Sequence, residues 1–219
     1  MTMTRRLKPL EIGHIPNLPC PGCTECAFWE SPDMLERRCG SLCDGGLLRE
    51  RIGEINREWG ECGRVAAEDD EILGFIKYGP ARYFPQSRNF EAGPIDPDTP
   101  MLACIHIKDE ARRLGLGDVL LKAALRDLSL HGEKQVMAYA FASGRDALLE
   151  PVIGVDFLLR NGFTVAAPHP AYPLLKLDLR SLATWAENLD ALLQALRIPI
   201  PSPHRMPSPS IKIKGRSHG

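Results

Sequence analysis

The segment from residue 100 to residue 141 constrains the fold most, because a strand, a glycine-containing turn, a helix and a second strand follow one another in it. The run PMLACIHIK (100–108) is apolar almost to its end, as expected for a central strand buried on both faces. From Gly117 to His131, apolar side chains gather mostly on one helical face and charged ones lie away from it. The run QVMAYAF (135–141) then predicts a second strand. A strand, a crossover helix and another strand predict a parallel strand pair.

Two shorter apolar runs precede this unit and predict an antiparallel hairpin. They are CGRVAAED and EILGFIKYG, and the acidic residues Glu68 to Glu71 separate them. Acidic residues favour turns and surfaces, so this cluster is expected at the tip of the hairpin, in contact with water. A hairpin followed by a parallel pair predicts a mixed sheet in an α/β fold.

The composition excludes several classes of partner. The chain has 219 residues, of which 27 are Lys or Arg and 28 are Asp or Glu, so its net charge is −1. Such a chain has no bulk field that attracts nucleic acid or a membrane surface, and neither is expected as a partner. No run of about 18 apolar residues predicts a membrane span, and the first residues lack the apolar stretch of a secretory signal. We therefore expect a cytoplasmic protein.

The turn between the central strand and the helix has the features of an anion site. The first amides of a helix have no intrahelical acceptor, and the helix dipole adds partial positive charge at this end. Glycine lets a bulky anion approach the backbone, and arginine adds charge-assisted bonds to phosphate oxygens. The turn predicts a phosphate cradle that consists of Arg112, Arg113 and the amides of Leu114, Gly115, Leu116, Gly117 and Asp118.

Two better-known phosphate motifs do not fit this turn. A dinucleotide fingerprint requires a third glycine where Leu120 stands. A nucleoside triphosphate loop requires Gly-Lys-Ser/Thr, whereas Gly117 is followed by Asp118. Glycines at a strand-to-helix turn also serve tight packing alone, and that interpretation stays open.

The stretch Arg112-Arg113-Leu114-Gly115-Leu116-Gly117 resembles the Q/R-x-x-G-x-G/A signature of the GNAT N-acetyltransferase superfamily, in which this turn binds the pyrophosphate of acyl-coenzyme A. A second stretch, FLLRNGF (157–163), resembles the F-Y-x-x-x-G-F helix end that recurs in the same family. The resemblance covers roughly residues 61–180. It implies a mostly antiparallel central sheet with a splayed parallel strand pair and flanking helices.

The resemblance also implies how acetyl-coenzyme A, the acyl donor, binds. In the family the pantetheine arm inserts between the splayed strands and pairs with strand backbone. The matching positions are Ile105, His106 and Ile107, and the amide of Ile107 or of a neighbour would bond the thioester carbonyl. A donor there stabilises the oxyanion that develops as an amine attacks. The implied activity is direct transfer of an acetyl or similar acyl group from coenzyme A to an amine.

Proton transfer is where the chain departs from the family pattern. The family often places an acid tyrosine at the position of Leu158, so here the acid is expected from Tyr139, Tyr172 or Ser143. A thiolate also leaves unaided because it is a weak base. The loss of the usual tyrosine therefore does not exclude activity.

Four residues are candidates for the general base, namely Glu68, Asp69, Glu91 and His106. The acidic cluster at residues 68–71 also fits a solvated hairpin turn, and His106 also fits a hydrogen-bonded core residue. The residues advanced as catalytic are Tyr139, Tyr172, His106 and Glu68.

Cysteines concentrate in the first sixty residues. Of the seven in the chain, five lie there, namely Cys20, Cys23, Cys26, Cys39 and Cys43. A Cys-x-x-Cys step suits tetrahedral zinc, and Cys39 or Cys43 would complete the ligand set. The spacing also fits a redox-active or alkylation-prone thiol pair, or thiols that only pack beneath a loop-rich extension. All three interpretations stay open, although in a cytoplasmic protein reduced thiols or metal ligands are expected rather than disulfides.

Four parts of the chain are expected. They are a cysteine-rich segment packed on the core (1–60), an acyl-coenzyme A-binding acyltransferase core (61–180), a C-terminal helix (181–197) and a disordered tail (198–219). An alternative function keeps the fold without catalysis, as an acyl-coenzyme A-binding or thiol- or zinc-sensing module. The expected partners are acyl-coenzyme A and an amine substrate, for a monomer or a homodimer.

Overall fold

The computed structural model describes residues 5–32, 40, 42–112, 114–142 and 150–182. The expected helix at 181–197, apart from its first two residues, and the expected tail at 198–219 lie outside these residues. Within the described part of the chain, no helix is both long and apolar enough to cross a membrane.

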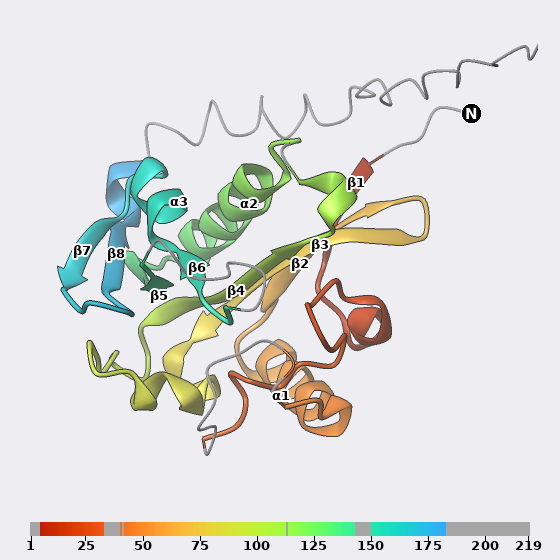
Figure 1. Ribbon diagram of the computed structural model, residues 1–219, viewed down its shortest axis with the longest axis horizontal. Coiled ribbons are helices and arrows are strands. Elements are labelled where there is room, and N and C mark those ends of the chain that lie inside the picture. Colours follow the sequence, from red (N-terminus) through yellow and green to blue (C-terminus); the bar gives the residue numbers. More distant parts are fainter. Residues whose placement is uncertain (1–4, 33–39, 41, 113, 143–149, 183–219) are drawn as a thin grey trace, which may run out of the picture.

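One mixed sheet forms the centre of the molecule (Figure 1), in the order β1-β2-β3-β4-β5-β8-β7, with β6 beside β5. Its strands are β1 (Arg5–Pro9), β2 (Gly63–Glu68), β3 (Glu71–Pro80), β4 (Pro100–Ile107), β5 (Gln135–Phe141), β6 (Ile153–Gly154), β7 (Thr164–Ala167) and β8 (Leu174–Asp178). Antiparallel pairs predominate, and β4 and β5 run parallel. The expected α/β fold with a mostly antiparallel sheet and a parallel pair is confirmed.

Helices cover both faces of this sheet (Figure 1). On one face lie α2 (Leu116–Leu130) and α3 (Val155–Arg160), and on the other lies α1 (Gly45–Glu58) with the N-terminal segment. Asp44 caps the N-terminus of α1, where its carboxylate accepts a hydrogen bond from the amide of Leu47 at 3.0 Å. Because buried residues recur along α1 at helical spacing, one side of it packs on the sheet. The sheet therefore separates two apolar cores.

The first sixty residues contribute to the sheet and to the core on the α1 side. Strand β1 pairs with β2, so the sheet begins within this segment. Phe28 and Trp29 are each 1% exposed, and the Trp29 indole donates a hydrogen bond to the carbonyl of Pro151 at 3.0 Å. The indole also stacks on Phe90, with ring centroids 5.5 Å apart. These two aromatic residues thus hold the segment on the sheet.

The parallel contact between β4 and β5 is very short. Met101 and Met137 are the one pair of Cα partners in their register, although β4 continues to Ile107 and β5 to Phe141. The register between β3 and β4 also shifts, with Lys77 opposite Cys104 and Tyr78 opposite Leu102, so Ala103 is the extra residue of a β-bulge. A bulge bends its strand, and beyond Met101 β4 and β5 are no longer paired with each other. In the gap between them lies β6, which pairs in parallel with Ala140 and Phe141 of β5 and also contacts β4.

A buried ionic network ties α2 to the sheet. Asp127, on α2, is 7% exposed and accepts two hydrogen bonds from the Arg64 guanidinium, at 2.6 and 2.8 Å. The Tyr78 hydroxyl donates to the same carboxylate at 2.6 Å. Burial and the negative charge of Asp127 raise the pKa of Tyr78 above its usual range, which keeps this hydroxyl protonated. One carboxylate thus satisfies donors from β2 and β3.

Asp127→Ala is expected to lower the free energy of unfolding by about 2–4 kcal/mol, because it leaves the buried Tyr78 hydroxyl without its acceptor and the partly buried Arg64 guanidinium with Glu61 alone. Urea unfolding followed by circular dichroism measures the change. Asp118→Ala, on the exposed first turn of the same helix, serves as the control and should cost no more than about 1 kcal/mol. Equal losses in the two variants would contradict the role given to the network.

Candidate functional site

The turn after β4 leaves its backbone open at one glycine. Gly115 has a φ of 73° and is the N-cap of α2, a helix of 15 residues. A Cβ built on Gly115 would meet nothing within 4 Å. Because the first amides of a helix have no intrahelical acceptor, an anion can reach them here without displacing a side chain. The turn is thus open at Gly115, and the phosphate cradle stays a prediction.

The second glycine of the turn has a packing role. A Cβ on Gly117 would lie 3.4 Å from the side chains of both Ile107 and Phe157, so glycine allows the helix to approach the end of β4 and α3. Asn161 then joins the two motifs, since its amide nitrogen donates to Asp118 at 3.1 Å and to the Phe157 carbonyl at 2.9 Å. The stretches at residues 112–118 and 157–163, far apart in sequence, therefore form one structural unit.

Arg112 lies beside this unit and is half-buried. Its Nε atom donates to the carbonyl of Ile107 at 3.3 Å and lies 3.0 Å from Asp109 Oδ1. These contacts hold the guanidinium against the end of β4. Arg113, the other arginine of the predicted cradle, lies outside the described residues.

The three strand positions expected to bind the donor lie where β4 borders the gap. Ile105, His106 and Ile107 pair with β3 on one side, and the gap toward β5 lies on the other. Along a strand, main-chain groups point alternately to its two neighbours, so some N–H and C=O groups of this stretch face the gap. Ile105 and Ile107 pack with the α2 core, whereas Cys104 and His106 line a cavity on the α1 side.

The cavity contains one charged side chain among mostly apolar walls. Lys77 reaches it from β3, and its ammonium nitrogen lies 2.5 Å from Glu30 Oε1. Burial opposes the charged form of Lys77, but the Glu30 carboxylate outweighs it and raises the pKa of the lysine above its usual range. Neither residue stands out in the sequence, because partners 47 positions apart leave no signal in the local pattern. The pair is a buried, oppositely charged unit beneath β4.

His106 is uncharged at neutral pH. Its side chain is buried, and burial, together with the positive charges of Lys77 and Arg112, lowers its pKa from 6.5 to about 3. A general base works best when its pKa lies near the working pH. The environment of His106 therefore disfavours the role of base and favours that of an uncharged wall of the cavity.

Tyr139 and Tyr172 meet around one phenylalanine on the same face of the sheet. The Phe90 ring stacks on Tyr139 at 4.3 Å and contacts Tyr172 edge-to-face at 5.5 Å, measured between centroids. Burial raises the pKa of Tyr139 to about 12, and its hydroxyl has no hydrogen-bond partner among the described residues. The Tyr172 hydroxyl lies 3.2 Å from Glu150 Oε2, a buried carboxylate that sequence analysis did not single out. Ser143, the third candidate acid, is outside the described residues.

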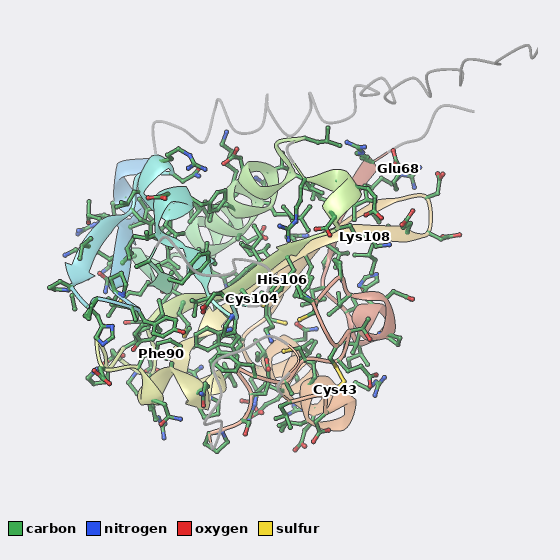
Figure 2. All side chains as sticks on the ribbon, viewed as in Figure 1. Cys43, Glu68, Phe90, Cys104, His106 and Lys108 are labelled. Carbon is green, nitrogen blue, oxygen red and sulfur yellow. A yellow bond between two sulfur atoms is a disulfide. The ribbon has the colours of Figure 1, made fainter. Side chains whose placement is uncertain are left out.

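The acidic candidates are scattered. Glu68 lies 3.3 Å from the Arg5 guanidinium near the hairpin tip, and Figure 2 shows it at the opposite end of the sheet from Phe90. Glu91 instead lies near the tyrosines, where its carboxylate is 3.0 Å from His169 Nε2. His169 Nδ1 accepts hydrogen bonds from the amides of Ala171 and Tyr172, so Nε2 carries the proton given to Glu91. The structure does not bring Glu68 together with the two tyrosines.

The cysteine segment corrects two expectations. Cys23 and Cys43, the latter directly before α1 (Figure 2), form a disulfide, whereas reduced thiols or zinc ligands were expected. Disulfide sulfurs are not thiolates and do not ligate zinc. Cys20 and Cys26 are not disulfide-bonded, and Cys39 lies outside the described residues. Across the described ranges, no group of three or more His, Cys, Asp or Glu could hold a metal ion.

The remaining thiols fit the packing interpretation. A hydrogen bond with Cys20, together with burial, raises the pKa of Cys26 above its usual range. Burial raises the pKa of Cys62 and of Cys104 to about 12. Because the thiolate is the reactive form, these environments oppose redox or nucleophilic chemistry.

Comparison with known proteins agrees with this geometry. The acetyltransferase (GNAT) family model matches residues 29–149, more than half of the chain. PaiA N-acetyltransferase from Thermoplasma acidophilum, solved in complex with coenzyme A, matches with a TM-score of 0.55 and 17% identity over 80% of this chain and 99% of that one. The loading GNATL domain of CurA from Lyngbya majuscula matches with a TM-score of 0.52 and 16% identity over 81% and 98%. At such identities the likeness to solved structures shows the fold alone, and no curated protein matches the chain.

Gly115→Glu is expected to weaken the binding of coenzyme A by about 100-fold or more, because a carboxylate would occupy the place of a phosphate. Gly132→Glu is the matched control. That glycine follows the other end of α2, has a φ of 83°, and also has nothing within 4 Å of a built Cβ. Isothermal titration calorimetry measures the affinity of both variants for coenzyme A. Similar affinities in the two variants would contradict a diphosphate site at this turn.

The low pKa of His106 predicts a pH dependence of stability. Between pH 6.5 and pH 3 the unfolded chain takes up a proton on this imidazole while the folded chain does not, so stability falls with the pH in that window. His106→Gln is expected to remove roughly 3 kcal/mol of the destabilisation between pH 7 and pH 4. Urea unfolding at a series of pH values measures the free energy of unfolding of the variant and of the unaltered protein. An unchanged slope in the variant would show that His106 titrates normally.

Proposed function

Because the chain belongs to the GNAT acetyltransferase family, we propose that it transfers an acetyl or similar short acyl group from coenzyme A to an amine. The observation that carries the proposal is the end of pairing between β4 and β5 after one pair of partners, which leaves β4 from Ile105 to Ile107 without a β5 partner next to the open turn at Gly115. Both features suit a long, thin molecule that carries a diphosphate. Coenzyme A, when bound, supplies an acyl group activated as a thioester.

The residues that hold the donor follow from these two features. The amides from Leu114 to Asp118 and the side chain of Arg112 would bind the diphosphate. The main chain from Ile105 to Ile107 would pair with the pantetheine arm, as an added strand does. An amide of that stretch would donate to the developing oxyanion, and Ile107 is the first candidate.

The proton donor is assigned to Tyr139. Its hydroxyl has no hydrogen-bond partner among the described residues and is protonated at neutral pH, so it can donate a proton, although burial raises its pKa to about 12 and makes it a weak acid. The Tyr172 hydroxyl is next to Glu150, and this pair is the better candidate for taking a proton from the amine, directly or through water. His106 and Glu68 are less suited, since the pKa of His106 is low and Glu68 forms an ion pair near the hairpin tip.

Incubation of the protein with acetyl-coenzyme A and a panel of amines tests the proposal. We expect free coenzyme A thiol to be released only when both the acceptor and the enzyme are present. Mass spectrometry should then detect the acylated amine. Gly115→Glu provides the inactive control, because its open turn is blocked. Tight binding of the donor without turnover of any amine would instead indicate a non-catalytic acyl-coenzyme A-binding module.

A further inference from the structure

Three cysteines of the N-terminal segment lie next to one another. Cys23 and Cys43 form a disulfide, with their Cα atoms 5.9 Å apart. Cys26, which follows Cys23 in the same loop, is not disulfide-bonded and forms an antiparallel β-bridge with Cys43. Cys43 therefore has one cysteine bonded to it and a second one opposite it. None of these three residues takes part in the proposed acyl transfer.

The backbone hydrogen bonds around the bridge determine how Cys26 and Cys43 face each other. The amide of the residue after each cysteine donates to the carbonyl of the residue before the other, at 3.0 and 3.2 Å. Cys26 and Cys43 are thus a non-hydrogen-bonded pair, in which the Cα atoms lie about 4.5 Å apart and both side chains point to the same face. A disulfide requires Cα atoms about 4.4–6.8 Å apart. The pair meets this requirement.

The surroundings of the sulfurs govern how fast they react. Cys43 is exposed, whereas Cys23 is 9% exposed. The Cys26 sulfur accepts a hydrogen bond from the amide of Gly40 at 3.4 Å, but a hydrogen bond with Cys20, together with burial, raises the pKa of Cys26 above its usual range. Because the thiolate is the form that attacks a disulfide, the raised pKa slows attack at neutral pH. The equilibrium between two pairings depends instead on their relative stability.

We propose that Cys23, Cys26 and Cys43 form a thiol–disulfide exchange site with two interchangeable pairings. The Cys26 thiolate attacks the Cys43 sulfur, the Cys26–Cys43 bond forms, and the Cys23–Cys43 bond breaks with its electron pair on the Cys23 sulfur. The proton that Cys26 gives up ends on Cys23. One disulfide and one thiol are present before and after, so the step needs neither an oxidant nor a reductant.

The two pairings are expected to be close in stability. Cys23 and Cys43 are 20 positions apart, and pairing Cys26 instead shortens the closed loop only by the step from Cys23 to Cys26. Chain entropy then changes the equilibrium by less than about twofold. The second pairing removes the hydrogen bond of Cys26 with Cys20, which favours the pairing seen in the structure by about tenfold.

The exchange would change the cavity beneath β4. Cys26 lines this cavity together with Cys104 and His106 of β4. In the second pairing its sulfur would be bonded toward the exposed Cys43, directly before α1, and the cavity would lose one thiol from its wall. The segment that packs on the α1 face therefore has two covalent states, and one of them alters the surroundings of β4.

Peptide mapping distinguishes the two pairings, because Glu25 lies between Cys23 and Cys26 and a protease that cleaves after glutamate separates them. The folded protein is incubated with a trace of reduced glutathione at mildly alkaline pH, acidified to stop exchange, alkylated and digested without reduction. Tandem mass spectrometry then identifies the linked residues. We expect Cys23–Cys43 as the major link and Cys26–Cys43 in roughly one molecule in ten.

Two serine variants form a matched pair, since each removes one of the two partners of Cys43. Both are incubated with reduced and oxidised glutathione, and the oxidised form supplies the oxidant for a new disulfide. Cys23→Ser should form the Cys26–Cys43 link in most molecules, whereas Cys26→Ser should keep Cys23–Cys43 and show no second pairing. Cys23→Ala is the substitute if Cys23→Ser does not fold.

The outcomes test the exchange separately from the proposed function. Absence of the Cys26–Cys43 link from the incubated, unaltered protein would overturn the exchange site. In Cys23→Ser, a Cys43 that stays reduced or pairs with another cysteine would show that Cys26 does not reach it, and would overturn the site as well. A link between Cys23 and Cys26 would overturn the assignment of Cys43 as the shared sulfur. Each of these results leaves the acyl transfer untouched, because the exchange requires no coenzyme.

Discussion

Strands β4 and β5 share one pair of Cα partners, Met101 and Met137, and then separate. A sheet normally satisfies the main-chain groups of an interior strand on both of its edges, and unpaired buried groups are costly. Beyond Met101, β6 pairs with the end of β5, and among the described residues β4 forms no ladder on this edge, so a ligand that carries its own amides can pair with it there. The turn at Gly115 follows the end of β4. The main chain of β4 and of this turn would therefore position both the amide-bearing arm and the diphosphate of such a ligand, without help from side chains.

Much of this arrangement could be predicted from local pattern. The apolar run at 100–108, the helical face after Gly117 and the return at 135–141 correspond to β4, α2 and β5 within about one residue at each end. The two family motifs are local as well, and the structure adds that Asn161 joins them. Periodicity and turn chemistry are encoded by neighbours in sequence, so these features needed no tertiary information.

Features that depend on distant partners could not be predicted. The Lys77–Glu30 and Tyr172–Glu150 contacts join residues 47 and 22 positions apart, and nothing in either local sequence marks them. The disulfide between Cys23 and Cys43 was missed because cysteine spacing does not specify connectivity, and a reducing compartment had been assumed. The strand at Arg5–Pro9 was assigned to the cysteine-rich segment, because five residues with mixed polarity carry little strand signal.

The two faces of the sheet carry different parts of the molecule. The turn at Gly115 is held by α2, α3 and Asn161, all on one side, whereas α1 and the N-terminal segment lie on the other. If the turn binds the coenzyme as proposed, changes confined to surface loops on the α1 side would alter what the protein acts upon and leave this turn intact.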